Sequence, residues 1–324
     1  MARAIRVHET GGPDVLRWEQ LEVGAPGKGE LRIRHTAVGL NYIDVYHREG
    51  SYPLHLPTGL GVEAAGIVEA VGPEVQGFSV GDRVVYAGGP PGAYATERLL
   101  PAARAAKLPA GVSDQLAASV FFKGLTAEYL IRRCHEVAKG DIVLWHAAAG
   151  GVGSLACQWL NHIGATVIGT VGTDEKAQRA KENGCSFTIN YRKEDFVARV
   201  KEITGGKLVS AVYDSVGKDT ILGSLDCLRP RGILVSFGTA SGPTPSIDLA
   251  ALGARGSLYV TRASIAHYTA QRAEFEAGAD AVFKALGQGI LKVTSPTTYP
   301  LDEVAQAHRD IQGGKTTGSV VLTL

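Results

Sequence analysis

A run of small residues midway along the chain has the composition of a phosphate-binding turn. Residues 144–153 read LWHAAAGGVG. Glycines there would let a pyrophosphate reach backbone N–H groups at a helix N-terminus, where a Cβ would block its approach. Ala147 or Ala148 stands where the simple GxGxxG pattern has its first glycine. The turn is predicted to bind a dinucleotide, the alternative being a turn used only for packing. The residues predicted to contact the ligand are Gly150, Gly151, Val152 and Gly153.

The residues after the next predicted strand indicate which dinucleotide is bound. A NAD site places a carboxylate about 20 residues beyond the glycines, to bind the ribose hydroxyls. Here the strand tip is Gly172, which would leave room for a 2′-phosphate. Lys176, one helical turn on, could pair with that phosphate, and Tyr191 could donate its hydroxyl to it. We therefore predict NADPH. Asp174 lies near the NAD-type position and is either a ribose ligand or a carboxylate favoured by the helix N-terminus.

The elements that must position these residues alternate between strand and helix from residue 141 onward. Such alternation is typical of an α/β fold with a doubly wound parallel sheet, covered on both faces by helices. The predicted strands are Ile142–Trp145, Thr166–Val171, Phe187–Tyr191, Val209–Asp214 and Ile233–Phe237. The predicted helices follow Gly153, run from Glu175 to Asn183 and from Asp195 to Ile203, and include Ile221–Leu228.

The first hundred residues differ, because they read mostly as short strands with no long helical period between them. These strands are Ala4–Val7, Leu31–Val38, Ala64–Val71 and Arg83–Tyr86. Ser113 is then predicted to cap one helix, and a second helix is predicted near Thr126–Arg132. A helix over Ala270–Leu286 and a strand over Ser319–Leu324 complete the chain. Because the last strand resembles the first block, we predict domains of 1–122 and 123–264, with 265–324 returning to the first.

Length, composition and charge limit the possible classes of protein. The 324 residues suggest two domains, and 45% hydrophobic with 20% charged residues is typical of a folded globular protein. A net charge of +1 argues against a general nucleic-acid binder, although a local basic pocket is compatible with it. No apolar run approaches the roughly 20 residues of a membrane span, and the N-terminus lacks the apolar region of a signal peptide. We expect a cytoplasmic protein with reduced cysteines.

Several motifs spread over the whole chain are shared with one known family. They lie at residues 39–46, 61–66, 123–126, 140–153 with Gln158, 213–217 and 235–238. On these motifs the chain resembles the zinc-free NADPH:quinone oxidoreductases, the zeta-crystallin-like members of the medium-chain dehydrogenase/reductase superfamily. The resemblance implies a GroES-like β-barrel domain formed by both chain ends, a Rossmann domain, and a homodimer. It also implies reduction of a small-molecule quinone by hydride or electron transfer from NADPH.

The same resemblance implies which residues surround the nicotinamide and the acceptor. Asn41, Tyr46 and Thr126 would line the cleft between the domains, where Asn41 could donate to the carboxamide or to a quinone oxygen. Tyr46 or Tyr52 could deliver a proton, as could bulk water. Arg262 is alternatively a surface ion-pair partner. A family arginine near the cofactor is missing, and Lys315 is the candidate to replace it. The further implied cofactor contacts are Ser215, Phe237, Val260 and Arg262.

The chain lacks the zinc ligands of the superfamily's alcohol dehydrogenases. Their cysteine ligand aligns near Asn41, and the histidine of their His-Glu pair aligns with Val62, which leaves only Glu63. One carboxylate does not hold a catalytic zinc. The four cysteines are far apart in the sequence, so no structural zinc site is predicted either. We predict that no residue of this chain ligates a metal.

Two rival functions remain open. One is NADPH-dependent reduction of activated C=C bonds, as in 2-alkenals and enones, which would use the same hydride. The other is a non-catalytic NADPH- or RNA-binding role of a crystallin-like protein. Lys176 and the glycine turn argue against loss of cofactor binding, and the balanced charge argues against RNA. The acceptor pocket would be built from variable loops, so the two enzyme hypotheses are not separated. The apolar strand Gly256–Val260 is predicted to pair with its copy in a dimer.

Overall fold

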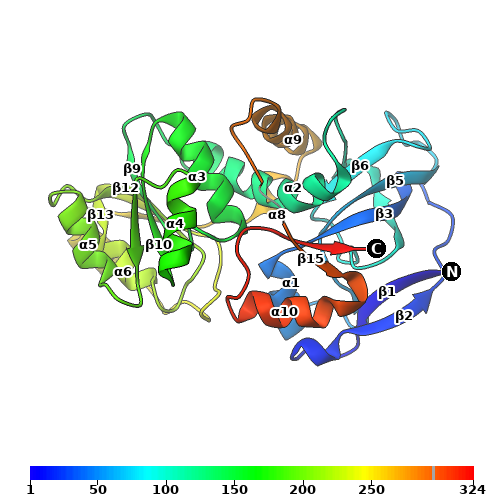
Figure 1. Ribbon diagram of the computed structural model, residues 1–324, viewed down its shortest axis with the longest axis horizontal. Coiled ribbons are helices and arrows are strands. Elements are labelled where there is room, and N and C mark those ends of the chain that lie inside the picture. Colours follow the sequence, from blue (N-terminus) through cyan, green and yellow to red (C-terminus); the bar gives the residue numbers. More distant parts are fainter. Residues whose placement is uncertain (294–295) are drawn as a thin grey trace. The chain divides into compact units, whose positions relative to one another are not determined.

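The computed structural model describes residues 1–293 and 296–324, which form two compact units (Figure 1). Unit 1 comprises Met1–Leu125, Thr269–Phe283 and Val293–Leu324. Unit 2 comprises Thr126–Tyr268 and Lys284–Lys292. The predicted boundaries lie after residues 122 and 264, a few residues before the points where the two units divide here.

Unit 2 is built on a six-stranded parallel sheet with the order β11-β10-β9-β12-β13-β14. In chain order this is 3-2-1-4-5-6, the doubly wound order, and it confirms the predicted parallel α/β sheet. The buried strands are continuously apolar, as strands covered on both faces must be. Their bounds are β9 Ile142–Trp145, β10 Thr166–Val171, β11 Phe187–Asn190, β12 Val209–Asp214, β13 Leu228–Ser236 and β14 Tyr259–Arg262.

Helices cover both faces of this sheet, α3 and α4 on one side and α5 and α6 on the other (Figure 1). Each central strand sends a fully buried side chain into the core between sheet and helices. These side chains are Leu144, Ile168, Ile189, Val212 and Leu234. The helices of unit 2 are α3 Gly151–Ile163, α4 Asp174–Glu182, α5 Phe196–Ile203, α6 Ile221–Asp226, α7 Leu249–Ala254 and α8 Ile265–Tyr268, with a π-helical turn η3 at Tyr129–Cys134.

Unit 1 contains a three-stranded sheet, β2-β1-β4, and a seven-stranded sheet, β15-β16-β3-β5-β6-β8, in which β7 also pairs with β3. The C-terminal strand β16 pairs antiparallel with β3. The chain therefore returns to the first block, as its last strand predicted. The strands are β1 Ala2–Val7, β2 Arg17–Leu21, β3 Glu30–Leu40, β4 Thr58–Gly59, β5 Glu63–Val71, β6 Arg83–Ala87, β7 Glu97–Pro101, β8 Ala105–Lys107, β15 Thr297–Pro300 and β16 Val320–Thr323.

The helices of unit 1 correct two expectations. Helix α1, Tyr42–Glu49, interrupts the first block, where only strands were predicted. Helix α2, Asp114–Glu128, is one continuous helix rather than two. Gly124 reads as a break in the sequence, yet a Cβ there would lie only 3.0 Å from Val282, so the glycine serves close packing. The other helices are α9 Arg272–Gly287, α10 Val304–Gln312 and the 3-10 turns η1 Pro13–Val15, η2 Ala102–Arg104 and η4 Leu301–Glu303.

Among the described residues, no helix is long and apolar enough to span a lipid bilayer.

Candidate active site

The predicted phosphate-binding turn connects β9 to α3. Ala147 adopts a left-handed conformation with φ 54°, so it is the residue that replaces the first glycine. A Cβ on Gly153 would lie 2.5 Å from the carbonyl oxygen of Ala147 and 2.8 Å from that of Ala148. Only glycine fits there, because those oxygens belong to the backbone of the turn. Gly153 therefore lets the helix pack against the strand end.

The N-terminus of α3 presents backbone donors at this turn. Gly150 is the N-cap residue, and it has no side chain with which to bind the first N–H groups of the helix. Those groups have no partner within the helix, so they are available to an anionic ligand, which the helix dipole also favours. The backbone N–H of Gly150 itself donates to Ala147 O over 2.9 Å, which closes the turn.

The predicted residues of unit 2 follow the carboxyl ends of successive strands. In a parallel sheet these ends lie at one edge, so residues far apart in the sequence are brought together there. Successive strands are added toward one edge of the sheet up to β11 and toward the other edge from β12 onward. The order of the strands therefore reverses between β9 and β12, which are parallel neighbours in the sheet. The glycine turn thus lies at the switch point, where open α/β sheets bind their ligands. The residues at this edge are Gly172 after β10, Tyr191 after β11, Ser215 after β12 and Phe237 after β13. Val260 and Arg262 lie within β14, of which Arg262 is the last residue.

Two cationic side chains, Lys176 and Arg192, interact with each other close to Gly172. A Cβ there would lie 2.8 Å from Tyr191 Oη and 3.7 Å from Arg192 Nε. The room left by the glycine is therefore taken by the Tyr191 hydroxyl, which refines the sequence-based expectation of an empty space. Burial lowers the pKa of the half-buried Lys176, and the positive charge of Arg192 lowers it further. Two cations this close repel each other, and a dianionic phosphate would relieve that repulsion.

Arg192 was missed by the sequence analysis. It directly follows Tyr191 in the chain, and its backbone N–H donates to Asn190 Oδ1 over 3.2 Å. That contact shapes the turn after β11 and brings the guanidinium toward Gly172. The signal that could have revealed Arg192 was its adjacency to a residue already assigned to the phosphate.

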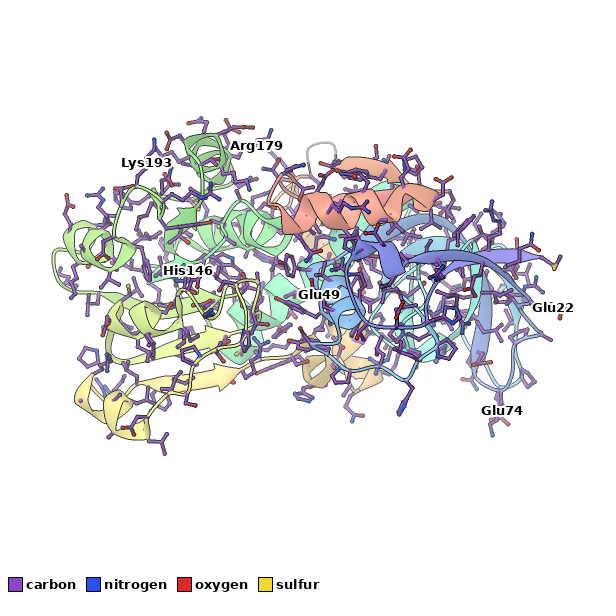
Figure 2. All side chains as sticks on the ribbon, turned by 90° about the horizontal axis from the view of Figure 1, so that it is seen from below. Glu22, Glu49, Glu74, His146, Arg179 and Lys193 are labelled. Carbon is purple, nitrogen blue, oxygen red and sulfur yellow. The ribbon has the colours of Figure 1, made fainter. Side chains whose placement is uncertain are left out.

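Asp174 faces other partners. It is the first residue of α4, whose N-cap Thr173 accepts from the backbone N–H of Lys176. Its carboxylate accepts from Asn190 Nδ2 over 2.8 Å and from Lys193 Nζ over 2.6 Å. Lys193 lies on the surface of unit 2 (Figure 2), and its hydrogen bond lowers the pKa of Asp174. These contacts agree with the helix N-terminal reading of Asp174.

His146 lies inside unit 2, at the end of β9 (Figure 2). Its Nδ1 is 2.9 Å from Thr170 Oγ1 and its Nε2 is 3.0 Å from Ser224 Oγ. Burial lowers the pKa of His146, so the ring is neutral. These two hydrogen bonds hold the ring of His146 at the strand end.

The last strands of the sheet carry the remaining predicted contacts. Phe237 packs against Trp145, with ring centroids 5.6 Å apart. Arg262 Nη1 donates to Ser236 Oγ and to Gly238 O, each over 3.2 Å. These bonds hold the guanidinium at the carboxyl end of β13. Val260 is 38% exposed and Tyr259 62% exposed, so β14 is an apolar strand at the open edge of the sheet.

In unit 1, Asn41 is the N-cap residue of α1 and is only 4% exposed. Its Nδ2 donates to Glu63 Oε2 over 2.8 Å, and its backbone N–H donates to Asp44 Oδ2 over 2.9 Å. Helix α1 begins here because Asp44, at the third helical position, completes a capping box with Asn41.

Three tyrosines adjoin Asn41 on and after α1. The Tyr46 ring lies 5.2 Å from that of Tyr42 and 5.0 Å from that of Tyr52. Burial raises the pKa of Tyr42 to about 12. Tyr46 and Tyr52 thus pack together in unit 1, to which Asn41 and Lys315 also belong. The other predicted site residues belong to unit 2, including the buried Thr126.

A buried hydrogen-bonded chain extends from the start of α1 to α10, and no sequence signal pointed to it. Arg48 Nη1 donates to His308 Nδ1 over 3.0 Å, so the ring hydrogen is on Nε2. That hydrogen is directed to Tyr94 Oη at 3.1 Å, and Tyr94 donates to Asp44 Oδ2 over 2.8 Å. Burial lowers the pKa of His308 to about 3 and raises that of Asp44 to about 7.

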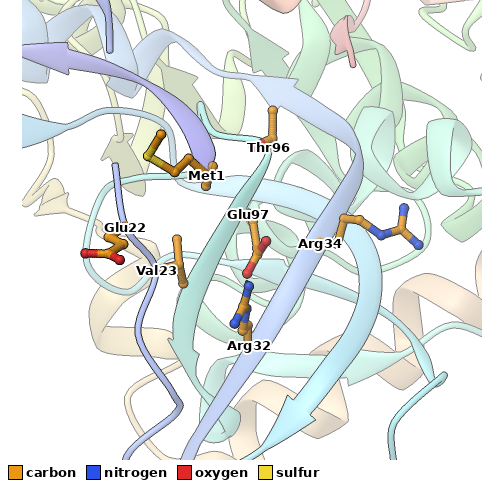
Figure 3. Close-up of a pocket in the computed structure, with 8 residues that line it drawn as sticks. Met1, Glu22, Val23, Arg32, Arg34, Thr96 and Glu97 are labelled. Atoms are coloured by element: carbon orange, nitrogen blue, oxygen red, sulfur yellow. The ribbon is translucent and has the colours of Figure 1, made fainter. Parts of the chain in front are cut away.

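A pocket of about 300 Å³ in unit 1 shares no residue with the predicted site (Figure 3). Glu97 and Arg32 point toward one another across it and form an ion pair, while Arg34 pairs with Glu69. The charges of Arg32, Arg34 and Glu97 are therefore already paired within the protein. The lining residues are Met1, Ala2, Glu22, Val23, Arg32, Arg34, Thr96 and Glu97.

The residues at the position of the alcohol dehydrogenase zinc do not suit that metal. Asn41 and Val62 replace the thiolate and the imidazole, and the Glu63 carboxylate is already bound by nitrogen donors. Among residues 1–293 and 296–324, no group of three His, Cys, Asp or Glu side chains could hold a metal ion. The four cysteines are free, and Cys157 Sγ lies 3.4 Å from Cys185 Sγ.

Lys315, the candidate to replace the family arginine near the cofactor, forms an ion pair with Asp310 in unit 1.

A glycine turn at the switch point of a doubly wound sheet, in a chain with a second β-rich unit, defines a class of dinucleotide-dependent oxidoreductases. Two family models match accordingly. The one described as zinc-binding dehydrogenase covers residues 151–284, and the one described as alcohol dehydrogenase GroES-like domain covers residues 27–110. They confirm the predicted combination of a GroES-like and a Rossmann domain.

Similarity to individual proteins identifies the family within this class. The chain is 48% identical to the 2-haloacrylate reductase of a Burkholderia species and 47% identical to the quinone oxidoreductase of Pseudomonas aeruginosa, each over 99% of both chains. The crystal structure of Escherichia coli quinone oxidoreductase complexed with NADPH is 46% identical, matches 100% of both chains and superposes with a TM-score of 0.98. The chain belongs to the quinone oxidoreductase family of the medium-chain dehydrogenase/reductases.

Proposed function

We propose that this chain reduces quinones with NADPH and without a metal ion. The observation that carries the proposal is the pair of cations in unit 2, Lys176 and Arg192, of which Arg192 lies against Gly172 after β10. A 2′-phosphate is the group that distinguishes NADPH from NADH, and this pair of cations matches its charge. The NADPH complex of the Escherichia coli relative supports the same assignment.

The residues of unit 2 bind and orient the cofactor, which supplies a hydride when bound. The backbone N–H groups at the start of α3 donate to the pyrophosphate, because a helix N-terminus stabilises anions. Lys176, Arg192 and the Tyr191 hydroxyl bind the 2′-phosphate. Ser215, Phe237, Val260 and Arg262 contact the rest of the cofactor along the same edge of the sheet.

The residues of unit 1 act on the acceptor. Reduction of a quinone leaves an anionic hydroquinone oxygen, which a hydrogen-bond donor stabilises. The Asn41 amide is such a donor, and Tyr46 or Tyr52 supplies a proton if water does not. A quinone is a strong acceptor already, so it does not need the Lewis acid that alcohol oxidation requires.

A second candidate is the reduction of an activated C=C bond. The 2-haloacrylate reductase relative, at 48% identity, favours it. The hydride would then add to the β-carbon of the C=C bond, and the negative charge would develop on the carboxylate or carbonyl oxygen. A proton added at the α-carbon would complete the reduction. Asn41 would stabilise that oxygen as it does a quinone oxygen, so both candidates use the same residues.

The test is NADPH oxidation by the purified protein with quinones, 2-haloacrylate and enones, before and after treatment with a chelator. Turnover of quinones in chelator supports the first candidate, and turnover of 2-haloacrylate alone supports the second. NADPH binding without any turnover would support the non-catalytic alternative and overturn both. Loss of activity that zinc restores would contradict the metal-free reading.

We also propose that the protein is a cytoplasmic homodimer that pairs through β14. Tyr259 and Val260 are exposed on this edge strand, whose unpaired backbone groups are suited to extend the sheet into a second copy. Light scattering should give twice the chain mass at micromolar concentration. Val260→Lys should yield monomers, and a dimer unaffected by that change would place the interface elsewhere.

A further inference from the structure

A buried carboxylate in unit 1 gathers donors from three places in the sequence. Glu63, at the start of β5, is fully buried. Its Oε1 accepts the backbone N–H of Phe122 over 2.6 Å. Its Oε2 accepts Asn41 Nδ2 over 2.8 Å and Lys123 Nζ over 3.1 Å. Both oxygens are therefore satisfied, and all the donors belong to unit 1.

The neighbouring strand leaves space for this carboxylate. Gly39, on β3, pairs with Glu63 across the sheet. A Cβ on Gly39 would lie 2.2 Å from Glu63 Oε2 and 2.3 Å from the carbonyl oxygen of Ala118. Any other residue would displace the carboxylate from its donors. The sheet is thus shaped around Glu63 in this one position.

Stability alone does not account for a buried ion pair of this kind. The Lys123 side chain is 5% exposed and that of Glu63 is not exposed at all. Removing two charges from water costs free energy that their attraction often fails to recover, so apolar replacements are frequently as stable. The ion pair therefore needs another explanation. Glu63 accepts a hydrogen bond from the side-chain amide of Asn41 and so fixes the position of that amide.

An ionised carboxylate accepts hydrogen bonds and donates none. It therefore determines which end of the Asn41 amide faces it, because only the NH₂ end can donate. An amide nitrogen carries two hydrogens, of which Glu63 binds one. The second remains for a ligand. The Asn41 side-chain oxygen accepts the backbone N–H of Asp44 in the capping box, so the two ends of the amide have different partners. Without the negative charge at Glu63, the NH₂ end would lose its charged acceptor.

We propose that Glu63 and Lys123 are positioning residues for the reduction, acting through Asn41. Glu63 orients the amide so that its second N–H donates to the acceptor oxygen. Lys123 holds Glu63 in place through its ion pair with Oε2. The inference rests on the proposed function and adds to it the residues that prepare the donor.

The test compares Asn41→Ala, Glu63→Gln and the double variant Asn41→Ala/Glu63→Gln. Each single change should lower kcat for the quinone about a hundred- to a thousandfold, as loss of one oriented oxyanion donor does. The double variant should be no slower than Asn41→Ala, because Glu63 acts only through the amide. The KM for NADPH should change less than about twofold, since the phosphate contacts lie in unit 2.

A stability control separates positioning from folding. Glu63→Gln leaves Lys123 buried without its counter-ion and should lower the Tm, whereas Glu63→Gln/Lys123→Met removes both charges and should recover it. The kcat of Glu63→Gln/Lys123→Met should nevertheless stay as low as that of Glu63→Gln. Glu97→Gln, which removes another ion-paired strand carboxylate of unit 1, should keep wild-type kcat.

The outcomes distinguish this inference from the proposed function. Wild-type protein that reduces neither quinones nor 2-haloacrylate would refute the proposed function. Active wild type with normal kcat in Glu63→Gln, or with multiplying losses in Asn41→Ala/Glu63→Gln, would overturn the positioning role. Recovery of kcat together with Tm in Glu63→Gln/Lys123→Met would show that the pair is structural only.

Discussion

The two polar sites of this chain, one in each unit, are organised in opposite ways. In unit 2, Lys176 and Arg192 interact close to a glycine, and the nearby Tyr191 is 50% exposed. In unit 1, Glu63 and Asp44 are fully buried and bound by neighbouring donors. If the first site binds the cofactor phosphate as proposed, its cations gain a further counter-charge from the ligand, whereas the geometry of the second site is set within the protein. Changes in unit 2 should therefore alter affinity, and changes in unit 1 should alter stability and turnover together.

The largest effect is expected from Gly39→Ala in unit 1. The new Cβ would collide with Glu63 Oε2 and with the backbone oxygen of Ala118, neither of which can move away freely. We expect the free energy of unfolding to fall by about 3 kcal/mol or more. Urea denaturation measures this loss. Gly12→Ala is the control, because a Cβ there meets nothing within 4 Å and should change stability by less than about 0.5 kcal/mol. Similar losses in both variants would contradict the buried geometry.

A smaller effect should follow from the titration of Asp44. Burial raises the pKa of this carboxyl from 3.8 to about 7, against the opposing influence of its hydrogen bonds from Asn41 and Tyr94 and of the Lys123 charge. Since the folded state retains the proton to higher pH than the unfolded state, stability falls as pH rises between about 4 and 7. From pH 5 to pH 8 this amounts to about 2–3 kcal/mol.

Asp44→Asn should remove that part of the pH dependence. The amide oxygen can still accept from Tyr94 and from the Asn41 backbone, but the side chain no longer titrates. We expect the difference in unfolding free energy between pH 5 and pH 8 to shrink by the amount just given, whatever constant offset the substitution adds. Parallel curves for variant and wild type would mean that Asp44 is already ionised at pH 5.

Lys176→Ala tests the exposed site of unit 2. Loss of a charge-assisted hydrogen bond costs about 1.5–3 kcal/mol, so NADPH should bind roughly ten- to a hundredfold more weakly. NADH affinity and Tm should stay unchanged, and the effect should shrink in high salt. Lys181→Ala, on the exposed face of the same helix, is the matched control and should leave both cofactors unaffected. Equal losses for NADH and NADPH would assign Lys176 to the fold or to the shared adenosine half.

The smallest effect is expected from Arg192→Ala. Its guanidinium is exposed and, in the proposed site, would share the phosphate with Lys176, so solvent would screen its contribution. We expect NADPH to bind about three- to tenfold more weakly, with no change in Tm. Fluorescence titration of both cofactors measures this. A fall in stability would mean that Arg192 belongs to the turn after β11 rather than to the ligand.

The sequence was most informative where structure is local. The bounds of β10 and β12 were predicted to the residue, because buried parallel strands are short apolar runs between polar turns. Gly172, Lys176 and Tyr191 were proposed as cofactor contacts for a similar reason, since each follows a strand end by a few residues. Helix α1 escaped notice because its eight residues mix polar and aromatic side chains and lie among strands.

The buried cluster of unit 1 was out of reach for a different reason. Glu63 binds Lys123, and Asp44 is linked through Tyr94 to His308. These partners come from distant parts of the chain, and only antiparallel pairing and the return of the C-terminal segment bring them together. A single sequence shows the residue types but no pairing, so Glu63 could be described only as the remnant of a metal motif.

The late position of β16 and His308 in the chain also bears on how the protein is synthesised. All six strands of unit 2 lie between Ile142 and Arg262, so this sheet can close while the ribosome is still adding the C-terminal segment. Strand β3, by contrast, emerges early and must wait for β16, which pairs with it last. We expect a nascent chain halted after Lys292 to hold a folded nucleotide-binding half, while its earliest strands stay open to the chaperones that shield unpaired edges.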